Sequence, residues 1–424
     1  MTVLGLDRRV LVLALARMAD SVGNSFLIVV LPLYIGSQVV TGTTFGLTES
    51  LITGVILSMF GLLNSLGQPF TGRLSDRLGK RRVFVLIGLA ILAVTDAAYA
   101  FATSYPTLIG IRAIQGIGVA FTIPATIALV NELATTETRG GNMGLFNTFR
   151  LIGFGTGPVV AGLVVDAGPY QFGGFGLSGF DAAFYIASAS AIVSFVLVTL
   201  LVRDPERTQA AAGDEVSVSI TDPADEHLLD PVFTLGVASL FMAIGIALLS
   251  TIEPLVNEHL GQGPTMFGIE FGAFIGAQVL LQTPIGSWSD RYGRKPFIVW
   301  GLVLLVPATF AQGLVFAPWQ MVVARFVQGI AGAMVFAPAL ALAGDIAKQG
   351  QSGTQLSVLT MSFGLGTALG PLSSGILIRY SYVVPFAFGS VLAAVGAVLV
   401  YTQVEDTVTG SAAESAGASS PTTE

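Results

Sequence analysis

Two stretches of the chain repeat one pattern, Gly72-Arg-Leu-Ser-Asp76-Arg77-Leu-Gly79-Lys80-Arg81 and Gly286-Ser-Trp-Ser-Asp290-Arg291-Tyr-Gly293-Arg294-Lys295, at a distance of 214 residues. Two further matches lie 213 residues apart: Arg112-Ala-Ile-Gln115-Gly116-Ile-Gly118 with Arg325-Phe-Val-Gln328-Gly329-Ile-Ala331, and Gly157-Pro158 with Gly370-Pro371. Three matches in almost one register indicate an internal duplication, in which each copy is one structural unit.

The composition places this duplication in a membrane. Of the 424 residues, 53% are apolar and 11% are charged, whereas soluble domains carry about 25% charged residues. A disordered chain and an ordinary soluble enzyme are therefore excluded. Membrane helices need about 20 apolar residues, and we predict twelve such spans between Arg8 and Gln403: 10–35, 47–71, 82–103, 106–131, 141–166, 178–202, 232–257, 266–288, 296–317, 319–346, 353–379 and 382–403.

Six predicted helices fall in each copy. Because six is an even number, both copies cross the membrane in the same direction and are related by a pseudo-twofold axis along the membrane normal. We expect an all-α integral membrane protein with two six-helix bundles, 1–202 and 232–403. Residues 203–231, with eight acidic residues against two arginines, predict a cytoplasmic linker. Residues 404–424 contain no Lys or Arg and predict a disordered tail.

Basic residues predict the orientation, because cytoplasmic loops are enriched in Lys and Arg. Both termini are expected to be cytoplasmic, in the cell membrane, and the first span is too long for a removable secretory signal. Three of the basic residues, Lys80, Arg81 and Arg82, are assigned to attraction of the inner leaflet. One set of alternating loops holds fourteen of the nineteen basic residues: Arg8, Arg9, Arg73, Arg77, Lys80, Arg81, Arg82, Arg139, Arg203, Arg207, Arg291, Arg294, Lys295 and Lys348.

Several kinds of chemistry are excluded by the residues that the chain lacks. It contains no Cys, and His227 and His259 are its only histidines, so we expect neither thiolate chemistry nor a metal site. It also lacks a Gly-rich phosphate loop and a nucleophile with a neighbouring base, so no cofactor and no enzymatic activity are expected. The net charge of −7 arises from acids that crowd the linker and the tail, which argues against nucleic acid as a partner.

The repeated pattern resembles the major facilitator superfamily over about Arg8 to Gln403. Gly-x-Leu-Ser-Asp-Arg-x-Gly-Lys-Arg between helices 2 and 3 is the most specific signature of that superfamily, and this chain has a second copy between helices 8 and 9. The stretches that begin at Arg112 and Gly153 are similar to motifs of its drug:proton antiporter branch. The resemblance implies a secondary transporter that works by alternating access and exports a hydrophobic or amphipathic small molecule in exchange for protons.

Two alternatives remain open. One is a transporter of a metabolite, such as a sugar or an organic acid, coupled to protons or to another ion. The other is a non-transporting receptor or scaffold with the same fold, against which the cost of burying charged residues argues. As partners we expect the lipid bilayer, a small-molecule substrate and protons, and we expect the protein to be a monomer.

The repeated pattern is expected to act as a conformational latch at the cytoplasmic end. Asp76 and Asp290 fit a tight turn in which a carboxylate faces the first amides of a neighbouring helix. By analogy with the superfamily, the acidic residues that end helices 4 and 10 pair with Arg77 and Arg291 and hold the inside closed. The latch residues are Gly72, Asp76, Arg77, Gly79, Glu132, Gly286, Asp290, Arg291, Gly293 and Asp345.

Small residues on helices 5 and 11 predict close helix packing. In each helix two glycines four residues apart form a smooth stripe that lets another backbone approach, and the proline that follows bends the helix. The motif can serve close packing alone or also act as a hinge, and both interpretations remain open. The residues are Gly153, Gly157, Pro158, Gly162, Gly366, Gly370, Pro371 and Gly375.

Charged residues inside the spans are candidates for proton coupling, because an ionised group near a helix centre costs about 2.5–3.5 kcal/mol. Asp20 shares one helix face with Asn24, close to the midplane, and we expect it to pair with Arg150 at the same depth. A carboxylate that alternates between dry and wet surroundings changes its affinity for protons, so Asp20 and Glu253 are the leading candidates. The full set is Asp20, Asp96, Arg112, Arg150, Glu253, Glu270 and Arg325.

Two arginines occupy matching depths on helices 4 and 10. We expect Arg112 to pair with Asp96, and Arg325 to pair with Glu253 or Glu270. Two roles remain open for both arginines. One is structural, either as a pair or by snorkelling to the outer surface, and the other is in coupling.

Apolar and amide side chains on the helices that line the central cavity of the superfamily are candidates for substrate contact. Such a wall suits an amphipathic or aromatic solute, and no multi-Arg cluster is found that would favour a phosphorylated substrate. Packing against other helices or lipid is the alternative. The candidates are Asn24, Phe26, Gln115, Phe121, Asn147, Phe241, Met242, Gln328, Met334 and Phe336.

Overall fold

A computed structural model describes residues 2–3, 6–37, 39–44, 46–133, 139–204, 220–221, 228–346 and 352–407. Most of the predicted linker and tail lies outside these residues. The N-terminal half contains β1 (Thr2–Val3), β2 (Leu6–Asp7), α1 (Arg8–Gly36), α2 (Glu49–Leu78), α3 (Arg81–Ala98), a 3-10 turn (Tyr99–Phe101), α4 (Tyr105–Leu133), α5 (Arg139–Ala167), β3 (Tyr170–Phe172), β4 (Phe175–Leu177) and α6 (Gly179–Leu201). The C-terminal half contains α7 (Pro231–Ala247), a 3-10 turn (Leu248–Thr251), α8 (Glu253–Leu260), α9 (Pro264–Tyr292), α10 (Arg294–Ala311), α11 (Pro318–Ile346), α12 (Ser352–Leu377) and α13 (Val384–Gln403).

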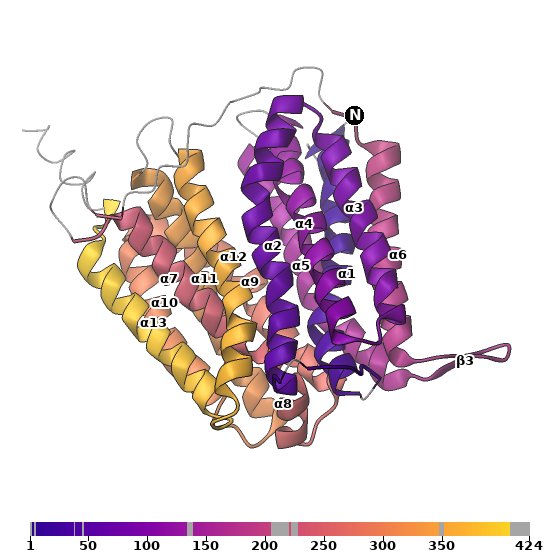
Figure 1. The fold of residues 1–424 in the computed structure, drawn as a ribbon. Helices are drawn as coiled ribbons and strands as arrows, with labels where there is room; N and C mark the ends of the chain where they lie inside the picture. Colours follow the sequence, from indigo (N-terminus) through magenta and orange to yellow (C-terminus); the bar gives the residue numbers. More distant parts are fainter. Residues whose placement is uncertain are drawn as a thin grey trace, which may run out of the picture.

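The two halves contain the same helix pairings. In the N-terminal half α1 packs on α5 and α6, and α4 packs on α2 and α3. In the C-terminal half α7 packs on α12 and α13, and α11 packs on α9 and α10. These pairs are equivalent after the duplication, so the predicted fold of two bundles is confirmed, and Figure 1 shows the bundles side by side.

The predicted spans differ from the structure in one place. Among the described residues, eleven helices are long and apolar enough to cross a membrane, and α12 lies where a span was predicted at 353–379. The span predicted at 232–257 is divided into α7, a 3-10 turn and α8. Pro254 explains this break, since proline cannot donate the backbone hydrogen bond that would continue the helix.

The repeated pattern is partly helical. α2 continues through it to Leu78, and Gly79, with a φ of 63°, ends the helix in the left-handed conformation that favours glycine. In the second copy α9 continues to Tyr292 and Gly293 follows with a φ of 100°. The tight turn therefore lies after the repeated Asp-Arg pair, and the first glycine of each pattern is inside a helix.

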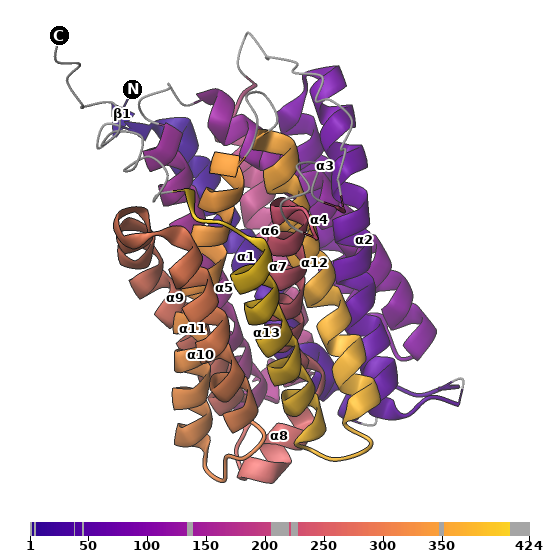
Figure 2. The same cartoon turned by 90° about the vertical axis from the view of Figure 1, so that its left-hand side faces the viewer.

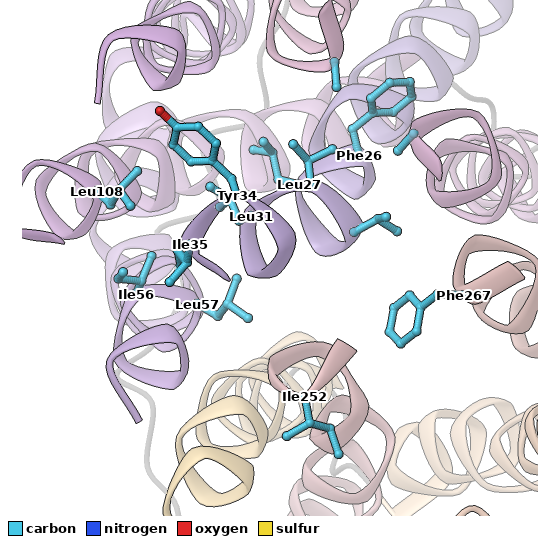
Figure 3. Packing of buried hydrophobic residues seen from close by; sticks show 14 of the residues in the cluster. Phe26, Leu27, Leu31, Tyr34, Ile35, Ile56, Leu57, Leu108, Ile252 and Phe267 are labelled. Atoms are coloured by element: carbon cyan, nitrogen blue, oxygen red, sulfur yellow. The ribbon is translucent and has the colours of Figure 1, made fainter. Parts of the chain in front are cut away.

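A hydrophobic cluster joins the two halves, and we call it the plug. Ile35 of α1 and Ile56 of α2 share this cluster with Phe267 of α9 and with Ile252, which precedes α8. Figure 3 shows plug residues from both halves. The plug lies at the end of the molecule that holds α8, opposite the turns between α2 and α3 and between α9 and α10, which form the basic end (Figures 1 and 2).

Helix backbones of the two halves also touch near the plug. A Cβ added at Gly54 of α2 would lie 2.6 Å from the carbonyl oxygen of Pro371 in α12, and a Cβ added at Gly268 of α9 would lie 2.3 Å from that of Pro158 in α5. Towards the basic end α2 instead has exposed residues such as Phe70, which is 73% exposed. The two halves are thus closed on each other at the plug end.

Gly153→Ala tests the close contact between α1 and α5. A Cβ at residue 153 would lie 2.3 Å from the carbonyl oxygen of Met18, so we expect overpacking to cost about 1–3 kcal/mol and to lower the Tm of the detergent-solubilised protein. The control is Gly144→Ala on the same helix, where no atom lies within 4 Å of an added Cβ. Equal Tm values for the two variants would contradict the close approach.

Candidate functional site

An arginine at the start of α3 joins three helices at the basic end. Arg81, which is 4% exposed, donates hydrogen bonds to Asp76 of α2 and, at 3.1 Å, to Glu132 of α4. Its Nη1 atom also donates to the hydroxyl of Ser75 at 3.1 Å. A single buried guanidinium group therefore fixes the ends of α2, α3 and α4 relative to one another.

The C-terminal half holds the same arrangement in a more exposed form. Arg294 starts α10, donates to Asp290 of α9 at 3.1 and 3.2 Å and also pairs with Asp345 of α11. Each cluster lies within one half. In this conformation the two clusters stabilise the halves and do not link one half to the other.

In this conformation the predicted latch arginines, Arg77 and Arg291, do not pair with Glu132 and Asp345. Both are exposed, and the acidic residues bind Arg81 and Arg294 instead, although the sequence assigned Arg81 to the membrane surface. The offset between the copies explains the difference. It falls from 214 residues before the turn to 213 after it, so Lys80 has no counterpart and the arginines that start the two helices are the equivalent pair.

The first amides of α3 and α10 are bound by acidic residues that the sequence analysis missed. Asp204, after α6, accepts a hydrogen bond of 2.8 Å from the second amide of α3. Asp406, after α13, accepts bonds of 3.2 and 3.3 Å from the first two amides of α10. Asp76 and Asp290 were predicted in this role, and they bind arginine side chains instead. A carboxylate at a helix N-terminus is favourable. The signal in the sequence was an aspartate shortly after the sixth membrane helix of each half.

A buried polar network connects α3 and α4. The Gln115 amide nitrogen donates to Asp96 at 2.5 Å, and its oxygen accepts from Arg112 at 2.7 Å and from the Tyr99 hydroxyl at 3.1 Å. The predicted pairing of Arg112 with Asp96 is therefore bridged by an amide. The guanidinium group of Arg112 also lies 5.0 Å from the ring centre of Phe60.

The equivalent arginine of the C-terminal half is enclosed by aromatic rings. Arg325 donates to Gln328 at 2.5 Å, and the amide nitrogen of Gln328 donates to Thr309 at 3.1 Å. The guanidinium group lies 5.2 Å from the ring centre of Phe271 and 4.7 Å from that of Phe274. Cation–π contact thus replaces part of the missing hydrogen bonding of this buried charge.

Two carboxyl groups near Arg325 are fully buried. Glu253 and Glu270 are both 0% exposed, and the side-chain amides of Asn257 and Gln262 interact with them. Glu270 interacts electrostatically with Arg325 and with Glu253, so the predicted pairing of Arg325 with a carboxylate is made without a hydrogen bond. Burial raises the pKa of Glu253, which follows the span Pro231–Thr251, well above its usual range, and the Glu270 carboxylate raises it further.

The predicted pair of Asp20 with Arg150 is wrong. Arg17, one turn before Asp20 on α1, donates to its carboxylate at 2.5 Å. Arg150 donates to the amide oxygen of Asn147, one turn earlier on α5, at 2.9 and 3.0 Å. Each arginine has a polar neighbour three residues away, on the same helix face. Asp20 also lines a small internal cavity with threonines of α4.

Most of the predicted substrate-contact residues belong to the packed interior. Phe26 and Met242 are buried in hydrophobic clusters, and Phe121 and Phe336 pack against other Phe rings at 5.6 and 5.1 Å between ring centres. Gln115 and Gln328 bind within their own halves. The remaining candidates are partly buried and stay predictions: Asn24, Asn147, Phe241 and Met334.

The glycines of α5 and α12 lie at backbone contacts of two kinds. The first two of each motif touch a helix of the same half, and the last touches the other half: Gly153 and Gly157 lie against α1, Gly366 and Gly370 against α7, Gly162 against α9 and Gly375 against α2. The Pro371 carbonyl, on the same helix, accepts a hydrogen bond of 2.9 Å from Thr251. One motif therefore shapes both the packing inside a half and the contact between halves.

Comparison with known proteins identifies the family. The model of the Major Facilitator Superfamily matches residues 13–234 and 233–424. This chain belongs to the major facilitator superfamily. As a member of this superfamily it is a multi-pass membrane transporter, and its relatives span nearly its whole length.

Two relatives in the superfamily are named for drug resistance. Quinolone resistance protein NorA of Staphylococcus aureus is 24% identical over 396 residues, which cover 90% of this chain and 93% of the relative. Multidrug resistance protein 2 of Bacillus subtilis is 24% identical over 388 residues, which cover 88% and 90%.

Solved structures show the same fold at lower identity. A bacterial homolog of the human lysosomal transporter Spinster has a TM-score of 0.75 at 15% identity and covers 92% of this chain and 95% of its own. The xylose transporter XylE from E. coli has a TM-score of 0.73 at 14% identity and covers 95% and 99%. The fold is thus shared with solved transporters, one of which is named for xylose.

A double-mutant cycle tests the cluster around Arg81. We expect Arg81→Gln and Glu132→Gln to be non-additive by about 0.5–3 kcal/mol in the free energy of unfolding, because the two side chains share a buried ion pair. Arg77→Gln combined with Glu132→Gln is the matched control and should be additive. Denaturation of the purified protein in detergent measures both cycles, and additivity in the Arg81 cycle would reject the pair.

Proposed function

We propose that this transporter exports hydrophobic or amphipathic small molecules in exchange for protons. Two relatives that align over about nine-tenths of the chain are named for resistance to quinolones and to multiple drugs, which supports drug-like substrates over sugars. The fold alone does not separate these classes, because a xylose transporter has the same fold. The buried carboxyl group of Glu253 carries the proton-coupling part of the proposal.

The conformation supports alternating access. The halves touch at the plug end, where Gly54 meets Pro371 and Gly268 meets Pro158. The basic end is the cytoplasmic end under the positive-inside rule, so this conformation faces inward. Opening to the outside requires the plug to separate, and the polar clusters of Arg81 and Arg294 keep each half rigid while it moves.

Glu253 links proton binding to this movement. It directly follows Ile252 of the plug, and its fully buried carboxyl group interacts with the amide of Asn257 and with the carboxylates of Glu270 and Asp166. Burying an ionised carboxylate without a positively charged partner is far more costly than burying a neutral one. The plug therefore closes readily only when Glu253 carries a proton, which the group takes up from the outside water when the plug opens. Export in exchange for protons then requires that this proton leave toward the cytoplasm while the plug is closed.

Asp20 is the second coupling group of the proposal. It lies in the N-terminal half, bound by Arg17, and so it keeps a counter-charge in this conformation. A proton on Asp20 would weaken this pair and release the guanidinium group. The two halves would then respond to protons in different ways, through a buried neutral acid and through an ion pair.

Exchange in proteoliposomes tests the coupling. We expect Glu253→Gln to abolish export driven by a pH gradient while substrate exchange without a gradient continues, because glutamine cannot release a proton, and we expect Asp20→Asn to do the same. Glu258→Gln is the matched control, an exposed carboxylate on the same short helix α8. Unaltered gradient-driven export in both coupling variants would reject them as coupling groups.

A solute panel tests the substrate class. We expect gradient-driven transport of amphipathic aromatic compounds, including a quinolone and a cationic dye, and none of xylose. Collapse of the pH gradient with a proton ionophore should stop the transport. Transport of xylose alone would favour the metabolite transporter instead.

A further inference from the structure

A β-hairpin extends from the N-terminal half between α5 and α6. It consists of the antiparallel strands β3 and β4, and Figure 1 shows it reaching sideways beyond α6, across the direction of the helices. Gly173 and Gly174 form its turn with φ values of 53° and 96°, as a two-residue turn between strands requires. In the C-terminal half the equivalent connection, 378–383, contains no strand. The hairpin is therefore a feature of one half only, which the shared architecture does not require.

The outer part of the hairpin has no protein surface beside it in the described part of the chain. Apart from chain neighbours, no described atom lies within 4 Å of a Cβ added at Gly173 or Gly174. A Cβ added at Gly176 would meet only the side chain of Gln171, which belongs to the hairpin itself. A two-stranded hairpin alone is marginally stable in water. A further surface is therefore needed to hold these strands in place.

The two faces of the hairpin differ in polarity. Alternate residues of a strand lie on opposite faces, so the register places positions 170, 172, 175 and 177 on one face and positions 171 and 176 on the other. The sequence has Tyr, Phe, Phe and Leu at the first four positions and Gln and Gly at the other two. No charged residue occurs from 167 to 180. This composition fits the interface between membrane and water, where aromatic residues are enriched.

The helices on either side place the hairpin at the surface of the bilayer. Both α5 and α6 are long and apolar enough to cross a membrane. The 23 residues of α6 extend over about 35 Å at about 1.5 Å per residue, whereas the hydrocarbon core is about 30 Å thick. Val164 and Phe180, which flank the hairpin, pack against the plug, and the Tyr170 hydroxyl donates a hydrogen bond of 2.9 Å to the Val164 carbonyl. The base of the hairpin is thus fixed at the plug end, where the hydrocarbon ends.

We propose that the β3–β4 hairpin is a membrane-surface anchor of the N-terminal half. It lies on the bilayer at the plug end, with the face of positions 170, 172, 175 and 177 against the lipid and the face of positions 171 and 176 towards water. Because the hairpin runs across the helices at the level where they leave the hydrocarbon, lipid is the surface directly beside it. The anchor holds the level of the N-terminal half in the membrane, and the C-terminal half has no equivalent hairpin among its described residues.

Single spin labels test the anchor, because the chain contains no Cys that would react in the background. The full chain with Gln171→Cys, Phe172→Cys, Phe175→Cys or Gly176→Cys is labelled with a nitroxide in vesicles of phosphatidylcholine, since the hairpin has no charge that would select an anionic headgroup. Power-saturation EPR then measures how often the label meets oxygen, which concentrates in lipid, and a nickel chelate, which stays in water. We expect the ratio of oxygen to nickel collisions to be severalfold higher at positions 172 and 175 than at positions 171 and 176.

A charge on either face gives the sharper test. With the label at Phe175→Cys, Phe172→Asp should lower the ratio to that of position 171, because an ionised carboxylate is costly in apolar surroundings. Gln171→Asp with the same label is the matched control. It adds the same charge on the other face and should leave the ratio unchanged. Val94→Cys, 70% exposed in the span Arg81–Phe101, gives the ratio of a label in lipid.

The outcomes separate lipid, water and a second copy of the chain. Low ratios at all four hairpin positions would show that water surrounds the hairpin and would overturn the anchor. Dipolar coupling between labels on different molecules, lost on dilution with unlabelled protein, would together with low ratios assign the hairpin to a contact between copies and also overturn it. If the variants with an added Asp fail to fold, the four single labels still decide.

The anchor stands apart from the proposed function. The label measurements need neither a substrate nor a pH gradient. Proton-driven export with low ratios at positions 172 and 175 would reject the anchor and uphold the function. High ratios at these positions without proton-driven export would uphold the anchor and reject the function.

Discussion

A charged side chain in an apolar interior must be neutralised or given a specific partner, and this constraint organises the protein. Arg81 at the basic end and Arg112 inside the N-terminal half meet it with carboxylates and a bridging amide. Arg325 meets it with the amide of Gln328, two phenyl rings and the nearby carboxylate of Glu270. The first two arrangements join helices through hydrogen-bonded ion pairs or a bridging amide, whereas the third relies partly on aromatic rings and on a carboxylate that is not hydrogen-bonded to the arginine.

The structure combines two rigid halves with a smooth contact between them. Inside each half, glycines, polar networks and hydrophobic clusters hold six helices together. Between the halves, α2 meets α12 and α5 meets α9 through glycine and proline backbones. Such contacts contain few long side chains that must be rearranged, so one half can tilt against the other without loss of its own packing.

The duplication made the fold predictable, because two copies of six apolar segments leave few arrangements. The details of the site were less accessible. Depth along a helix placed Asp20 and Arg150 at one level but gave no information on which neighbours they face. Each binds a residue one turn away on its own helix. The second copy of the repeated pattern lacks a residue equivalent to Lys80, and this one-residue difference hid Arg294 as the counterpart of Arg81. Pro254 divided a helix that hydropathy alone predicts to be continuous.

Comparison of the two halves separates structural charge from functional charge more clearly than burial does. Both halves bury an arginine and a glutamine of the same motif, so this pair belongs to the architecture. Only the C-terminal half replaces the carboxylate at that network with Thr309 and introduces Glu270 on α9 and Glu253 beside the plug. A duplicated fold retains what both copies need for packing. Where one copy departs from the other by burying further acid groups, packing does not explain the departure, and the proposed proton coupling assigns it a role at Glu253, which adjoins the plug.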